Sequence, residues 1–144
     1  MMKNNKYYLV VLILLMTLTV SAQSVLGKWK TVDDETGEEK SIVEIYKENG
    51  KIYGKIIEIF DPEKRDLPCK FCKGDDYNKP VLGLKIIKDM VKSGNAYKKG
   101  TITNPEDGKT YECRLKLDGD NNDRLQVRGY IAFFYRTQYW LRVQ

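Results

Sequence analysis

The sequence predicts an all-β fold, a single antiparallel up-and-down barrel of about eight strands that follows an N-terminal signal segment. Three observations predict it. Short runs rich in β-branched and aromatic residues alternate with turn signals after residue 22. Most links between these runs are short, so each strand can pair with the next one along the chain. No window of roughly 12 residues between them has a convincing helical periodicity.

Residues 1–22 have the three parts of a secretory signal peptide. Two lysines make its beginning positive, an apolar run covers residues 7–20, and Val20-Ser21-Ala22 supplies the short side chains that signal peptidase requires. The apolar run is shorter than the roughly 18 residues of a membrane-spanning helix. No cysteine follows the cleavage site to carry a lipid. We therefore expect cleavage near Gln23 and an exported soluble domain over residues 23–144, periplasmic or secreted.

Eight strands are predicted in this domain, at residues 26–32, 41–47, 51–60, 81–91, 96–103, 109–117, 124–134 and 137–143. Asn49-Gly50 predicts a tight hairpin turn between the second and third strands, because both residues accept positive φ. Residues 61–80 form a long polar segment that holds three of the four prolines. With eight strands the first and the last can pair, which closes the sheet and removes its edges.

Side-chain alternation predicts which faces line the barrel interior. In the sixth strand, one face is apolar and carries Tyr111, Cys113, Leu115 and Leu117. In the seventh strand, the apolar face carries Leu125, Val127, Gly129, Ile131 and Phe133. Successive side chains of a strand point to opposite sides of the sheet, so we expect both sets to face inward.

The composition excludes several function classes. The chain has no histidine, which excludes Ser–His and Cys–His nucleophile pairs and His-ligated metal sites. The basic excess after residue 22 is small and both signs are interspersed, whereas a nucleic-acid-binding protein typically has a clustered basic face. No phosphate-binding glycine loop or nucleophile elbow is present. The sequence therefore offers no catalytic residue and no cofactor site, and it favours a protein that is not an enzyme.

Cys69 and Cys72 form the sharpest local motif. In an oxidising compartment, two close cysteines in a proline-bearing loop favour a disulfide that staples the loop. A thiol redox role is the alternative, since nearby lysines and arginines can lower a thiolate pKa, but the chain lacks the βαβ context of thioredoxin-like motifs. A metal site built with Cys113 and Asp75 is disfavoured because structural zinc sites typically have a second close pair. Cys113 is either a buried free thiol or the partner of one of the other two cysteines.

The two ends of the domain resemble the calycin pattern. Gly27-Lys28-Trp29 is similar to the Gly-x-Trp of the first lipocalin strand, and Arg142 lies on the last predicted strand. The resemblance implies that Arg142 packs over Trp29 and closes the base of the barrel, and a guanidinium stacks well on an indole.

The whole domain more closely resembles a family of small exported bacterial proteins, domain of unknown function 2147. The matching segments are Gly27-Lys28-Trp29-Lys30-Thr31 with Asp33-Asp34, residues 56–62, Cys69-x-x-Cys72 leading into Pro80-Val81-Leu82-Gly83, residues 104–113, Val127-Arg128-Gly129-Tyr130, and Arg136-Thr137-Gln138-x-Trp140-x-Arg142. This resemblance implies export, a lipocalin-like barrel and a Gram-negative periplasm, and it brings no established activity.

Arg128 and Tyr130 are the candidate ligand-binding residues. They share one face of the seventh strand, where they would bind an anion or a planar ligand at the barrel mouth; the alternative is an ordinary outward face. The main hypothesis is a binding module for a small apolar or amphipathic molecule, since an eight-stranded barrel is either filled or wide enough for one small ligand. A thiol redox protein using Cys69 and Cys72 and a non-catalytic envelope interaction protein are the alternatives.

Overall fold

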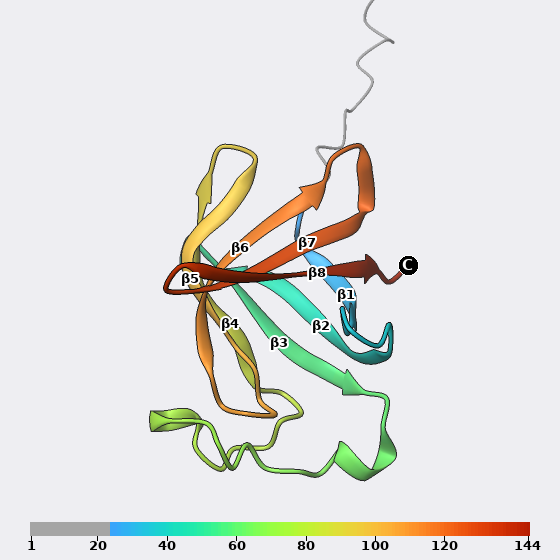
Figure 1. The fold of residues 1–144 in the computed structure, drawn as a ribbon, viewed down its shortest axis with the longest axis vertical. Coiled ribbons are helices and arrows are strands. Elements are labelled where there is room, and N and C mark those ends of the chain that lie inside the picture. Colours follow the sequence, from blue (N-terminus) through green and yellow to red (C-terminus); the bar gives the residue numbers. More distant parts are fainter. Residues whose placement is uncertain (1–23) are drawn as a thin grey trace, which may run out of the picture.

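A computed structural model describes residues 24–144, so the predicted signal peptide lies outside the described residues. The chain forms a closed barrel of eight strands in which each strand pairs antiparallel with its neighbour in sequence and β1 pairs with β8 (Figure 1). This confirms the predicted all-β up-and-down architecture. Closure leaves no free sheet edge along the paired length of the strands.

The strands are β1 (Gly27–Val32), β2 (Glu39–Glu48), β3 (Lys51–Ile59), β4 (Lys85–Ser93), β5 (Ala96–Thr103), β6 (Thr110–Asp118), β7 (Asn121–Ile131) and β8 (Phe134–Arg142). Two short 3-10 turns, η1 (Pro62–Lys64) and η2 (Gly74–Asp76), lie in the long segment between β3 and β4. The predicted hairpin turn after β2 is present, and both Asn49 and Gly50 adopt positive φ.

The fourth strand begins later than predicted, at Lys85 rather than Val81. The backbone groups of residues 81–84 are used elsewhere: Val81 N–H donates to Leu67, and the carbonyl of Leu84 accepts from Ile56. The first bond closes the long segment on itself, and the second attaches its end to β3 before regular pairing between β3 and β4 starts.

The last hairpin also differs from the prediction. Its turn is Ala132–Phe133, and Ala132 has a φ of 50°, so Tyr135 and Arg136 belong to β8 and not to a turn. Ile131 and Phe133 were expected in the interior, and this is wrong: they are 53% and 99% exposed. The reason is that β8 pairs with β1 only near its C-terminal end, so the other end of the β7–β8 hairpin extends past the barrel wall.

The barrel interior is filled by large apolar side chains. Trp29 and Trp140 lie fully inside it, and each indole N–H has a partner, the carbonyl of Val25 and the side chain of Gln138. The other fully buried side chains are Val43, Ile45, Cys69, Ile87, Met90, Leu115 and Leu125. At eight strands, side chains of this size are enough to occupy the interior.

The two ends of the barrel are built differently. The β4–β5 and β6–β7 turns lie at one end, at the top of Figure 1, and the long β3–β4 segment lies along the other with the β5–β6 turn. A Cβ on Gly108 in that turn would overlap the carbonyl oxygen of Phe71, so segment and turn are in direct backbone contact. Lys88 on β4 pairs with Asp76 of the segment. None of the helices in residues 24–144 is long and apolar enough to cross a membrane.

Candidate functional site

The base of the barrel is closed by Arg142 and Trp29. The guanidinium carbon of Arg142 lies 4.2 Å from the centroid of the Trp29 ring. Its nitrogens donate to the carbonyls of Ser24, Leu26 and Asn122 at 2.9–3.2 Å. A Cβ on Gly27 would lie 3.3 Å from the guanidinium, and the φ of Gly27 is +123°, which explains the glycine two residues before the tryptophan. Each nitrogen of the Arg142 guanidinium thus donates to a backbone carbonyl of the chain.

Cys69 and Cys72 are joined in a disulfide whose Cα atoms are 5.3 Å apart. Both cysteines are buried and pack with the apolar core, and the sulfur of Cys69 lies 3.6 Å from the carbonyl oxygen of Pro105 in the β5–β6 turn. The bond therefore closes a short ring within the long segment, on the side that packs against the barrel. Because both sulfurs are buried, a thiolate has no direct path to attack either one.

Cys113 is a buried free thiol on the inward face of β6. Burial raises its pKa to about 12, so it stays protonated at neutral pH. Within residues 24–144, no group of three or more Cys, Asp or Glu side chains is placed to hold a metal ion.

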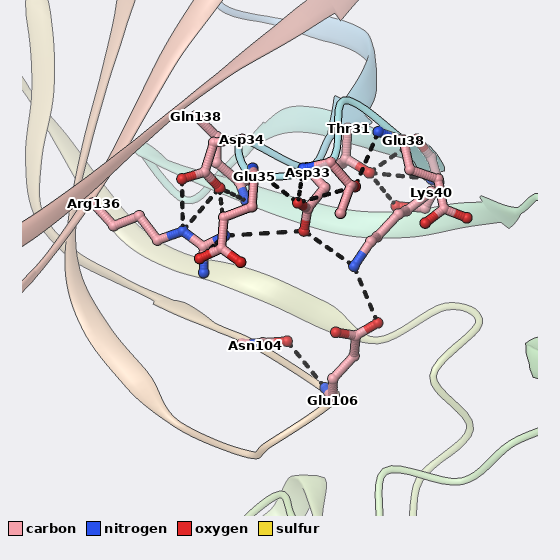
Figure 2. A network of polar contacts seen from close by, with 12 residues as sticks. Thr31, Asp33, Asp34, Glu35, Glu38, Lys40, Asn104, Glu106, Arg136 and Gln138 are labelled. Carbon is pink, nitrogen blue, oxygen red and sulfur yellow. Dashed lines mark hydrogen bonds and ion pairs between the residues drawn. The ribbon is translucent and has the colours of Figure 1, made fainter.

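A network of ion pairs lies at the end of the barrel that carries the β5–β6 turn, where Figure 2 shows Arg136 directed at Asp34 and Lys40 between Asp33 and Glu106. The Nε of Arg136 donates to both oxygens of Asp34 at 2.8 Å. Gln138 also donates to Asp34, and Gln138 accepts from the indole of Trp140, which connects the network to the core. The network thereby ties the β1–β2 loop to β8.

Asp33 and Lys40 extend this network to the β5–β6 turn. Lys40 lies 3.2 Å from Asp33 and 3.5 Å from Glu106. The backbone N–H of Thr36 and the ammonium of Lys40 lower the pKa of Asp33, and Arg136 lowers the pKa of Asp34. Both carboxylates are thus held in their charged form with a basic partner in place, and the network is satisfied without a ligand.

The structure places Arg128 and Tyr130 on the outer face of β7. Val127 and Leu125, their neighbours in the strand, are buried in the interior. The Nε of Arg128 donates to the hydroxyl of Thr137 at 2.8 Å, and its guanidinium stacks 4.4 Å from the Tyr135 ring. The pair therefore lies on the outside of the wall and not at the mouth.

An outer groove of about 670 Å³ begins at Tyr130 and crosses β6 to β5. A bulge in β5 forms its far side. Tyr97 pairs with Leu115 and Gly100 pairs with Cys113, so Lys98 and Lys99 together face the single residue Arg114. Lys99 has a φ of 63°, and this irregularity bends β5 away from the regular sheet.

Arg114 lies in the middle of a row of basic residues. Lys98 and Lys99 are across β5 on one side, and Arg128 is its direct partner on β7. The Nε of Arg114 is buried and makes no hydrogen bond. Among the described residues, none of these four has a carboxylate oxygen within 4 Å. Glu112 lines the same groove, so the row is the larger charge there.

A second hollow of about 640 Å³ lies at the closed end, lined by Ser24, Val25 and the β4–β5 and β6–β7 turns. Like the groove, it is open to solvent. Of the two hollows, only the groove is lined by an arginine, Arg114, whose Nε has no hydrogen-bond partner within the described residues.

The comparisons with known proteins agree with this fold. Residues 27–142 match a family model described as an uncharacterized protein conserved in bacteria, DUF2147. The chain belongs to the DUF2147 family. A solved structure described as protein HP1028 from Helicobacter pylori, a member of the lipocalin family, aligns with a TM-score of 0.71 and 25% identity over 84% of each chain. No curated protein matches the sequence. This DUF2147 chain is accordingly a lipocalin-like barrel, as the sequence resemblance implied.

Proposed function

We propose that this chain is an exported binding module that holds the acidic end of a small amphipathic molecule in the groove over β5, β6 and β7. The observation that carries the proposal is Arg114, whose buried Nε has no hydrogen-bond partner within the described residues and whose direct cross-strand partner is another arginine. The interior of this barrel is filled by large apolar side chains, so the ligand is placed on the outside, where Lys98, Lys99 and Arg114 line the groove.

An anion is the ligand that relieves both features of the arginine row. Like charges directly opposite each other on neighbouring strands repel, so Arg114 and Arg128 destabilise the empty protein. A phosphate or carboxylate between them accepts charge-assisted hydrogen bonds and supplies the missing counter-charge. A buried donor without a partner has already lost its water, so the bond it gains on binding is a strong one.

The apolar part of the ligand has a surface beside the groove. Tyr130 lines the groove, and the Tyr135 ring lies 6.0 Å from it on the neighbouring strand. An acyl or alkyl chain that leaves the arginine row in this direction crosses two aromatic rings. The interior does not offer a comparable space, because Trp29, Trp140 and Met90 are packed inside it.

The experiment is calorimetric titration of the purified protein with three probes: decyl phosphate, inorganic phosphate and the uncharged decyl maltoside. We expect decyl phosphate to bind more tightly than either of the others. Arg114→Gln and Arg128→Gln should each lower its affinity by roughly tenfold or more, the loss expected for a charge-assisted hydrogen bond.

Arg124→Gln is the matched control. Arg124 is also an outward arginine of β7, stacked 4.0 Å from the Tyr139 ring, but it pairs with Asp118 and, unlike Arg128, does not lie opposite Arg114. The affinity of the Arg124→Gln variant for decyl phosphate should stay within about twofold of the wild-type affinity. Failure of decyl phosphate to bind, or equal losses in all three variants, would refute the proposal.

Export and a stapling role for the disulfide belong to the same proposal. The signal-peptide pattern of residues 1–22 and the bond between Cys69 and Cys72 are consistent with an oxidising periplasm, and the matched family is bacterial. The buried position of both sulfurs favours a staple over the alternative of a thiol redox protein. Fractionation of expressing cells and the mass of the processed chain test this part directly.

A further inference from the structure

The tip of the β7–β8 hairpin carries the most exposed apolar group of the described residues. Four residues in the turn and the strand ends beside it are exposed: Ile131 at 53%, Phe133 at 99%, Phe134 at 75% and Tyr135 at 62%. Neither the barrel closure nor the proposed groove uses the two phenylalanines. Exposed apolar residues that are grouped in this way mark an interaction surface.

The tip is held by the hairpin below it. Ile131 pairs with Phe134 directly beneath the two-residue turn, and Tyr130 pairs with Tyr135 one step further down. Arg128 stacks on Tyr135, which fixes the outer side of the hairpin. Phe133 and Phe134 are therefore presented at the end of a paired ladder, in the region where β8 no longer contacts β1.

The charge around the tip identifies the partner. On the outer side, Glu112 lies across from Tyr130, and the basic row of Arg128, Arg114, Lys98 and Lys99 follows directly behind it. On the other side of the hairpin, Arg136 and Lys40 lie among the carboxylates of Asp33, Asp34 and Glu35. The four basic residues of the row outnumber Glu112, so the tip is apolar and aromatic with a net positive charge behind it on the outer side.

We infer that the hairpin tip docks onto an anionic lipid bilayer, with Phe133 and Phe134 inserted at the boundary between headgroups and acyl chains. Peripheral proteins bind stably when an apolar insertion is combined with a basic patch, and aromatic residues favour the membrane interface. A second copy of the chain is a poorer occupant, since symmetric pairing through the tips would bring two basic rows together.

Vesicle flotation of protein purified from cells that express the full chain tests this inference, with intact mass defining its N-terminus. The vesicles contain phosphatidylcholine alone or with about 30% phosphatidylglycerol. We expect flotation with the anionic vesicles only and release in about 0.5 M salt. The F133S/F134S variant should lose at least roughly tenfold in apparent affinity for the vesicles, because it lacks the two aromatic rings that insert into the bilayer.

Phe71→Ser is the matched control, because Phe71 is 63% exposed on the β3–β4 segment and lies outside the tip. It should float as the wild type does. F133S/F134S should still bind decyl phosphate, which separates this inference from the groove ligand. Flotation of F133S/F134S at wild-type level, equal binding to neutral vesicles, or tip-dependent dimers in analytical centrifugation would overturn it.

Discussion

Arg114 and Arg128 lie directly opposite each other on the outer faces of β6 and β7, with two lysines of a β5 bulge on the far side of Arg114. Neither arginine has a carboxylate within ion-pair distance in the described residues, and the Nε of Arg114 is buried without a partner. The pair has a measurable consequence for the empty protein as well as for binding.

Removing Arg114 from the arginine pair should stabilise the ligand-free protein. Arg114→Gln relieves the cross-strand repulsion with Arg128, and we expect the free energy of unfolding to rise by about 0.2–1 kcal/mol at low salt. The gain should vanish in about 0.5 M salt, where the repulsion is screened. Urea denaturation of the variant at the two salt concentrations measures this, and a loss of stability at low salt would contradict it.

Arg142 should be essential for stability and not replaceable by lysine. Arg142→Ala removes the stack on Trp29 and the bonds to the carbonyls of Ser24 and Asn122, so we expect a loss of about 2–3 kcal/mol. Arg142→Lys should recover little, because an ammonium does not reproduce the planar fork. Thermal denaturation provides the readout. The control is Arg124→Ala, another stacked arginine at the surface, with an expected loss below about 1 kcal/mol.

The three cysteines should not react with thiol reagents or mild reductant in the native protein. Cys113 is buried with a pKa of about 12, so it should not react with a thiol reagent until the chain unfolds. Mild reductant should leave the bond between Cys69 and Cys72 intact under native conditions. Mass spectrometry after alkylation, with and without urea, tests both statements, and native labelling of any cysteine would show that the segment opens.

Removing the disulfide should cost only a modest amount of stability. The ring closed by Cys69 and Cys72 is small, so the chain-entropy contribution is about 2 kcal/mol. Because both side chains also pack with the core, C69A/C72A should lose somewhat more than this value. The comparison that isolates the bond is the wild type against the same protein refolded and kept under reductant without alkylation.

Acid should weaken the ion pair that ties the β1–β2 loop to β8. The pKa of Asp34 is lowered by Arg136, so its contribution to stability is complete above about pH 4 and is lost as pH falls through its lower folded-state pKa. Asp34→Asn removes the pair, which is exposed and contributes up to about 1 kcal/mol. The variant should thus be less stable than the wild type at neutral pH, and the two should converge as pH falls through the lowered pKa of Asp34. Parallel stability curves across that range would contradict the prediction.

The sequence was sufficient for the architecture because its local signals agree. Asn49-Gly50 specifies one hairpin turn, and the alternation around Leu115 and Val127 identifies the inner faces. The predicted placement of Ile131 and Phe133 was wrong for a physical reason. Alternation tells which side of a strand a residue lies on, but not whether another wall lies opposite, and at the β7–β8 tip there is none.

The groove was less accessible from sequence. Tyr130 and Arg128 were singled out, but Arg114, Lys98 and Lys99 were not. A bulge arises from the register between β5 and β6, and the two lysines before Gly100 read simply as exposed strand residues. The Asp34–Arg136 pair joins residues far apart in the chain, so no local spacing in the sequence predicts it.

The buried disulfide also has a consequence for how the protein matures. Because Cys69 lies on the buried side of the β3–β4 segment, next to Pro105, an oxidising enzyme can reach the two thiols only before the segment packs onto the barrel. Cross-linking and docking therefore have a fixed order during biogenesis. Once the segment is packed, Cys69 and Cys72 keep the oxidation state that they reached in the compartment where the chain first folded.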